Sequence, residues 1–295
     1  MQFKVSIRYA LAASVFASIV SASTVAPVNA ETLAELATHT HYHGIAFARS
    51  GTAVLLLASH HGMFALDKDG TATRVSPVQD FMGFSPDPSN PVSYYASGHP
   101  AGGGNSGFLH SADGGATWKQ LSPGIDGPVD FHQMDVSPAD PKTIYGGYGQ
   151  IQVSRDAGST WAIAGNPPTD LIAIAASALK AERVYAATQN GLRVSEDGGT
   201  SWKLLSFEGE VVSTVNTGPG NVLYAFVLGR GLMKTVENTP SEWTSLANDF
   251  GNTIPLHLAV DEKDGRHLAL TTQANDVLES RDGGITWRPF GKGTE

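Results

Sequence analysis

Short apolar segments alternate with turn-forming residues along most of the chain. The segments are four to six residues long, and Gly, Pro, Asn or Asp bounds them, which is typical of buried β-strands. One such segment recurs at a similar place in successive stretches of sequence. Its copies lie at residues 54–58, 92–96, 184–187, 222–227 and 267–270. The pattern predicts an all-β protein.

The five tryptophans of the chain are almost evenly spaced. Successive tryptophans are 43, 41, 41 and 44 residues apart. A period of 40 to 50 residues that contains several short strands is typical of β-propeller blades. The five positions are Trp118, Trp161, Trp202, Trp243 and Trp287.

Four of these tryptophans end the same phrase, Ser-x-Asp-x-Gly-x-Thr/Ser-Trp, at residues 111–118, 154–161, 195–202 and 280–287. The Asp carboxylate can accept backbone N–H groups of a tight turn, and the Gly positions allow positive φ. The Trp then begins a strand and buries its ring against a neighbouring blade. We therefore expect a structural role for eight residues. They are Asp113, Trp118, Asp156, Trp161, Asp197, Trp202, Asp282 and Trp287.

The phrase resembles the Asp-box, or BNR, repeat, and the resemblance covers about residues 43–290. Propellers with this repeat include sialidases, sortilin-type receptors and photosystem assembly factors. The chain is also similar to exported bacterial BNR-repeat proteins that are catalogued as glycosyl hydrolases. The resemblance therefore implies the propeller fold, but it does not distinguish among the functions of these proteins.

Six copies account for the chain after a lead-in segment at 31–42. They predict one domain at 43–295, a six-bladed β-propeller of four-stranded antiparallel blades. Seven blades remain an alternative, because no displaced strand that would join the two ends is visible. The expected blades lie at about 43–77, 78–123, 128–166, 169–206, 210–247 and 253–291.

The first thirty residues have the pattern of a secretory signal. Lys4 and Arg8 precede an apolar run at 9–20, and small residues occupy 28–30. The run is shorter than the roughly 20 apolar residues that span a bilayer, so we expect cleavage after Ala30 and a periplasmic or secreted protein. No later segment is apolar enough to span a membrane.

Composition narrows the classes of function. The chain has no cysteine, which excludes a thiol nucleophile, a cysteine zinc site and disulfides. Lys and Arg total 19 against 28 Asp and Glu, a net charge of −9, which argues against a nucleic-acid partner. We expect a monomer.

Aligning the six copies gathers the histidines on one face. In a propeller, the start of each innermost strand lies near the loop between the second and third strands. One aligned column contains His41, Asp80, Asp130 and Asp170, and the next contains His43, Met82, His132 and Ile172; the loops add further histidines. Residues two apart on a strand share a face, so blades 1–3 bring these side chains together. The expected metal ligands are His41, His43, His60, His61, Met82, His99, His132 and Met134.

Imidazole and thioether donors together favour copper over zinc or manganese as the cofactor. Asp80 or Asp130 could instead ligate the ion, which would favour zinc or manganese, or orient a histidine. The alternative interpretation is a polar channel mouth whose histidines bind backbone and water. His110, His257 and His267 are out of register, and we expect structural roles for them.

Two other functions remain open, and with them whether the protein is an enzyme. A glycoside hydrolase or glycan-binding protein would use the carboxylates of Asp80, Asp130 and Asp170, since such enzymes need two facing carboxylates. A sialidase is disfavoured, because only Arg230 lies on the expected site face and no arginine triad is present. A protein-interaction or assembly scaffold is the third hypothesis.

Overall fold

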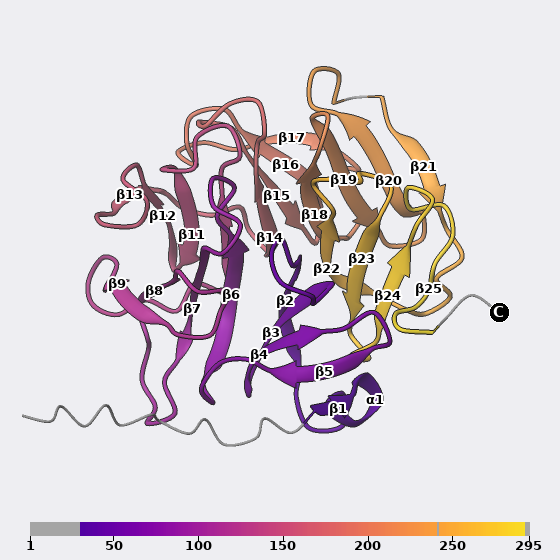
Figure 1. The fold of residues 1–295 in the computed structure, drawn as a ribbon. Coiled ribbons are helices and arrows are strands. Elements are labelled where there is room, and N and C mark those ends of the chain that lie inside the picture. The colour runs from indigo at the N-terminus through magenta and orange to yellow at the C-terminus, as the bar shows by residue number, and fades with distance from the viewer. Residues whose placement is uncertain (1–29, 241, 293–295) are drawn as a thin grey trace, which may run out of the picture.

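Six antiparallel β-sheets surround a central channel in the part of the chain that the computed structural model describes, residues 30–240 and 242–292 (Figure 1). Each blade uses four strands that follow one another in sequence. The blades are therefore β2–β5, β6–β9, β10–β13, β14–β17, β18–β21 and β22–β25. This arrangement confirms the predicted all-β, six-bladed propeller.

The first strand of each blade lines the channel. Each of these strands lies beside the first strands of the two neighbouring blades, and β22 lies beside β2, which closes the circle. The six innermost strands are β2 (Tyr42–Phe47), β6 (Asp80–Pro86), β10 (Gln133–Val136), β14 (Leu171–Ala176), β18 (Val212–Gly218) and β22 (Pro255–Val260).

The second and third strands form the buried middle of each blade. They contain the apolar runs seen in the sequence, and their side chains pack against both neighbouring blades. The second strands are β3 (Leu55–Ser59), β7 (Tyr94–His99), β11 (Ile144–Tyr148), β15 (Val184–Thr188), β19 (Val222–Val227) and β23 (Leu268–Thr272). The third strands are β4 (Gly62–Leu66), β8 (Phe108–Ser111), β12 (Gln150–Ser154), β16 (Gly191–Ser195), β20 (Gly231–Val236) and β24 (Val277–Ser280).

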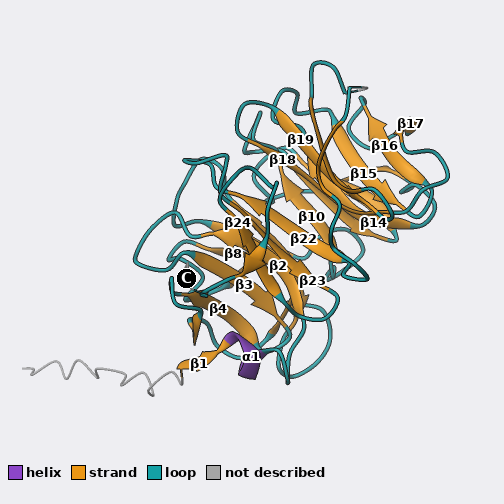
Figure 2. Ribbon diagram, turned by 90° about the vertical axis from the view of Figure 1, so that its right-hand side faces the viewer, coloured by secondary structure: helices purple, strands orange, loops and turns teal. Residues whose placement is uncertain are grey.

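The fourth strands form the rim of the propeller, and Figure 2 shows the blades from the side. Most of their side chains are exposed or half-buried, which explains why their sequences are the least apolar. The outer strands are β5 (Thr71–Arg74), β9 (Lys119–Ser122), β13 (Ala162–Gly165), β17 (Lys203–Ser206), β21 (Thr244–Ala247) and β25 (Arg288–Pro289).

The repeated phrase forms the same turn between the third and fourth strands of four blades. In blade 3, Ser154 Oγ donates to Asp156 Oδ1 at 2.9 Å, and the N–H of Gly158 donates to Ser154 Oγ at 2.8 Å. The carboxylate of Asp156 also accepts the backbone N–H and the hydroxyl of Thr160. Because the Ser and Asp side chains satisfy the turn's own backbone, the phrase stabilises the blade and needs no ligand.

The segment before blade 1 belongs to the fold. Strand β1 (Ala30–Thr32) pairs with β5, and the one-turn helix α1 (Leu33–Leu36) begins with a capping box between Thr32 and Glu35. This segment was expected only to lead into the ring, but it adds a fifth strand to the first sheet and buries Leu36 completely.

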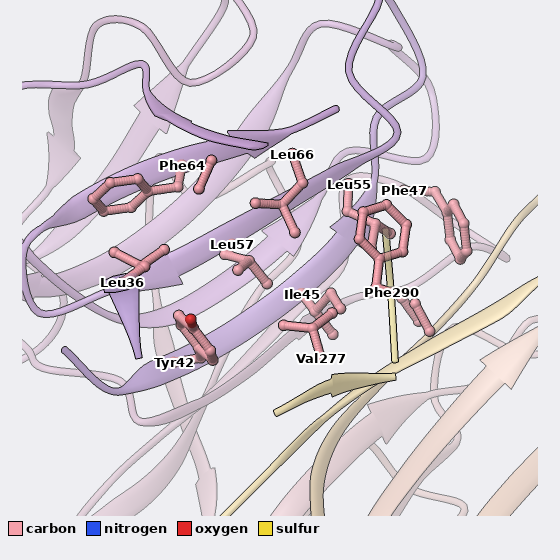
Figure 3. Packing of buried hydrophobic residues seen from close by; sticks show 13 residues of the cluster. Leu36, Tyr42, Ile45, Phe47, Leu55, Leu57, Phe64, Leu66, Val277 and Phe290 are labelled. Carbon is pink, nitrogen blue, oxygen red and sulfur yellow. The ribbon is translucent and has the colours of Figure 1, made fainter. Parts of the chain in front are cut away.

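Side-chain packing closes the ring between the last blade and the first. Figure 3 shows Phe47 and Leu55 of blade 1 close to Val277 and Phe290 of blade 6. Among the described residues, no blade is completed by a strand from the other end of the chain. The ring is therefore held closed by the burial of apolar surface between the two blades. Such burial contributes about 25 cal/mol for each Å² of apolar surface removed from water.

The predicted signal sequence lies outside the described residues except for Ala30, the first residue of β1. Within residues 30–240 and 242–292, no helix has the length and apolar character needed to cross a bilayer.

Candidate metal centre

A β-bulge marks the start of the innermost strands. In blades 1, 2, 4, 5 and 6 the pairing with the second strand skips one residue near the start of the innermost strand. A bulge adds local twist and redirects side chains, and it commonly lies beside functional sites. The skipped residues are His43, Met82, Ile172, Ser213 and Leu256. Three residues of the aligned column, His43, Met82 and Ile172, therefore occupy one structural position, while His132 lies just before β10, which pairs without a bulge.

Glycine after the bulge brings the first three blades close together. A Cβ on Gly44 would lie 2.9 Å from the Cβ of Phe84 in blade 2, and a Cβ on Gly83 would lie 2.1 Å from the carbonyl oxygen of Phe131, next to blade 3. Both distances are below any normal contact. Only glycine allows these approaches, so the side chains at the mouth of blades 1–3 can meet across the blade boundaries.

The first cluster joins blades 1 and 2. His43 lies on β2, His60 follows β3, and Asp80 begins β6. His43 Nε2 and His60 Nε2 are 3.0 Å apart, and His60 Nδ1 is 3.0 Å from Asp80 Oδ2. One donor atom from each of the three residues lies within 4.8 Å of the others, which is a spacing that can hold a metal ion.

Neutral imidazoles can satisfy the contacts at the ring nitrogens of this cluster, while Asp80 Oδ1 stays buried without a partner. In one such tautomer, His60 Nδ1–H donates to Asp80, and His60 Nε2 accepts the Nε2–H of His43. Burial, followed by the nearby rings of His60, His257, His132 and His41, lowers the pKa of His43 to about 3. His43 therefore stays neutral in mildly acidic solution, as a metal-binding imidazole must. To bind an ion through Nε2, His43 would carry its single proton on Nδ1 instead.

The second cluster repeats the His–Asp pair one blade further on. His99 ends β7 at the position that corresponds to His60, and it lies against Asp130, which precedes β10. The position equivalent to His43 holds Met82, and the other histidine of this cluster, His132, comes from the same blade as Asp130. Asp130 Oδ2 lies 2.8 Å from His132 Nε2 and 3.2 Å from His99 Nε2. The Asp130 side chain is only 8% exposed, and its Oδ1 is buried without a hydrogen-bond partner.

The other predicted ligands lie at the edge of these clusters. His41 is exposed and its Nδ1 is 3.2 Å from Asn275 Oδ1, while exposed His61 has its ring 6.0 Å from that of His39. Met134 packs in an apolar cluster with Phe131, although it also lines the channel. Met82 is buried at the bulge of blade 2. The structure thus brings together four of the eight predicted ligands, counting both clusters: His43, His60, His99 and His132. The ring of His41 lies 5.9 Å from that of His60, outside the cluster.

One expectation from the alignment needs correction. Asp170 was aligned with Asp80 and Asp130, but its side chain is exposed and its backbone has φ of +59°, so it joins neither cluster. His257 is out of register, as expected, because it follows the skipped residue of β22 at the position that Gly44 occupies in β2. It nevertheless lines the channel with His43 and His132. Burial lowers the pKa of His257 to about 4.

A cavity of about 120 Å³ lies in the channel, where all six innermost strands contribute to its lining. His43, His132 and His257 line it together with Asp135, which also lines a larger cavity of about 420 Å³ beyond it. Burial raises the pKa of the Asp135 carboxyl to about 6. The polar lining gives water and small solutes a suitable environment next to the two clusters.

No protein-family model matches the sequence, and no curated protein matches it. Solved propellers do match the structure. The GH74 xyloglucanase from Xanthomonas campestris is 18% identical with a TM-score of 0.58, and the GH74 enzyme from Niastella koreensis is 17% identical with a TM-score of 0.59. Both matches cover 84% of this chain and 45% of the enzyme, so the chain spans less than half the length of these relatives. YCF48 bound to D1 peptide is 18% identical with a TM-score of 0.55, over 91% of this chain and 87% of that one. At these identities the likeness shows that the chain shares the propeller fold.

Proposed function

We propose that this protein is an exported propeller that binds a divalent transition-metal ion, copper by preference, at the channel mouth and handles it outside the cytoplasm. The observation that carries the proposal is the convergence of His43, His60 and Asp80 from two blades, with donor atoms within 4.8 Å. Neutral imidazole and carboxylate are donors that first-row divalent ions bind well.

Two imidazole nitrogens that lie 3.0 Å apart can bind one ion together. Copper(II) stands above zinc in the general order of affinities for such donors, which supports copper as the preferred ion. The expected thioether contribution has less support, because Met134 belongs to an apolar cluster.

Asp80 has a defined place in this site. Its Oδ2 accepts the Nδ1–H of His60, which holds the ring so that Nε2 points at the shared position. Its Oδ1 is buried and has no partner among the described residues, so it is available to an ion. The proposal of export depends on the signal-like pattern of residues 1–30 and on the absence of cysteine.

Metal analysis of the purified, untagged chain tests the proposal. After removal of metals with EDTA, the protein is dialysed against copper(II) or zinc(II), and bound metal is counted. We expect tight copper binding that weakens by at least about 100-fold in His43→Gln and His60→Gln. His110→Gln is the matched control, because the His110 ring contacts Ser93 away from the mouth. Copper binding that is unchanged in both site variants, or absent from the wild type, would overturn the proposal.

Glycan cleavage is the second candidate, and the similarity to GH74 enzymes is the observation that favours it. The carboxylates would be Asp80 and Asp130. Hydrolysis of xyloglucan by the EDTA-treated protein, with loss of activity in Asp80→Asn and Asp130→Asn, would support this function in place of metal handling.

A further inference from the structure

The larger cavity lies at the end of the channel opposite the metal centre. Its volume of about 420 Å³ is inside the range of roughly 300–1,000 Å³ that small-molecule sites occupy. All six blades contribute to its lining, through residues near or just after the ends of the innermost strands. The metal-site residues His43, His60 and Asp80 do not line it. Four prolines stiffen its wall: Pro86, Pro88, Pro138 and Pro219.

Arg49 holds a positive charge rigidly on this wall. Its side chain is nine-tenths buried, its Nη2 donates to the carbonyl oxygen of Asn90 at 2.9 Å, and its guanidinium lies over the ring of Tyr94. Its Nη1 lies 3.6 Å from Glu262 Oε1, which is longer than a hydrogen bond. Nη1 has no hydrogen-bond partner among the described residues, and protein atoms do not enclose it. A fixed guanidinium with free N–H groups is a good partner for a carboxylate.

Hydrogen-bond acceptors lie deeper, where the larger cavity adjoins the smaller one. Asp135 and Asn216 line both cavities, whereas Arg49 and Glu262 line only the larger. Asn216 Nδ2 donates to the carbonyl oxygen of Leu258 at 2.8 Å, so its Oδ1 remains an acceptor. The Asp135 carboxylate receives three hydrogen bonds of the roughly four that it can accept. The deep end of the cavity therefore favours a ligand group that donates hydrogen bonds.

We propose that the larger cavity binds a small zwitterion, with a carboxylate at one end and an ammonium group at the other. The carboxylate accepts from Arg49 Nη1, and the ammonium group points inward to Asn216 and Asp135. Glu262, whose side chain is 53% exposed, shows that the cavity reaches the surface and competes for Arg49. The site does not depend on the proposed metal function, because no residue of the metal site contributes to it.

Titration calorimetry with zwitterions of three lengths tests this site. The probes are 4-aminobutyrate, 6-aminohexanoate and 8-aminooctanoate, added to the untagged full-length chain in EDTA so that no metal ion can hold the carboxylate. We expect at least one probe to bind. The alkanoate and the alkylamine of the same length each lack one end group, and each should bind at least about 10-fold more weakly. Failure of all three probes, or equal binding of a zwitterion and either truncated partner, would overturn the proposal.

Glu262→Gln is the most informative variant, because it should strengthen binding. It removes the carboxylate that competes for Arg49, so the zwitterion should bind about 3-fold more tightly. Glu208→Gln is the matched control, since it changes the charge equally on an exposed side chain that does not line the cavity. Arg49→Gln should abolish binding, and a melting curve shows whether it folds without its contact to Asn90. Equal affinities in Glu262→Gln and Glu208→Gln would overturn the assignment of the carboxylate to Arg49.

Discussion

The two ends of the propeller differ in how much equivalent positions vary from blade to blade. At the end that carries the turns between third and fourth strands, four blades form nearly identical hydrogen bonds around Ser111, Ser154, Ser195 and Ser280. At the channel mouth, equivalent positions hold different residues in every blade. His43, Met82 and Ile172 occupy one such position, and His60 and His99 occupy another only in blades 1 and 2.

This difference assigns the stability of the fold to the turns of the uniform end and the side chains available to a metal ion to the variable end. The turns of the uniform end satisfy their own backbone and bury their serines, so stability alone accounts for them. The variable end carries buried carboxylate oxygens, Asp80 Oδ1 and Asp130 Oδ1, that have no hydrogen-bond partner among the described residues. Those are features that cost stability in the absence of a ligand. Substitutions at the two ends should therefore have different signatures in unfolding and in metal binding.

The largest effect is expected from Gly83→Ala at the channel mouth. The new Cβ would lie 2.1 Å from the Phe131 carbonyl oxygen, so blades 2 and 3 must move apart. We expect a loss of about 3 kcal/mol in the free energy of unfolding, together with weaker metal binding at the His43–His60–Asp80 site, because Asp80 lies on the same strand as Gly83. Urea denaturation and metal counting measure the two effects.

The matched control is Gly102→Ala. Nothing lies within 4 Å of a Cβ at Gly102, and its φ is not positive. This variant should unfold within about 0.5 kcal/mol of the wild type and bind metal as the wild type does. If Gly83→Ala also behaved like the wild type, close approach of the blades would not be what positions the side chains at the channel mouth.

The same contrast explains how much could be predicted from the sequence. The Trp period predicted six blades, and the aligned columns singled out Asp80 and Asp130. The sequence could not show that each carboxylate pairs with a histidine from the preceding blade, because that depends on glycines that permit a close approach. His257 is out of register, as expected, but the alignment did not show that it lines the channel. Asp170 was misplaced because its backbone turns away into positive φ.

A smaller and purely structural effect is expected from Ser154→Ala at the uniform end. Ser154 is buried, and its Oγ is the acceptor for the Gly158 N–H at 2.8 Å. Alanine leaves that buried donor unpaired, which costs about 1–2 kcal/mol, while metal binding should stay unchanged. Ser159→Ala in the same turn is the control, because Ser159 is exposed. Loss of metal in Ser154→Ala would show that the two ends are coupled, and would contradict the independence of stability at one end and metal binding at the other.

The smallest effect is expected from His257, which lines the channel and contributes to the pH dependence of stability. Its pKa of about 4 in the folded protein lies below the ordinary value of 6.5, because burial disfavours the charged ring. Between about pH 6.5 and pH 4, the unfolded chain therefore binds one more proton than the folded protein. The free energy of unfolding falls as the pH is lowered through this window, and the decline ends below about pH 4. Urea denaturation in EDTA from pH 7.5 to pH 4 should show a shallower decline for His257→Gln than for the wild type. At pH 7.5 the ring is neutral in both states, so a comparison there isolates any packing change. Parallel declines in the two proteins would mean that His257 is protonated inside the channel, and the mouth would then carry a positive charge that opposes metal binding.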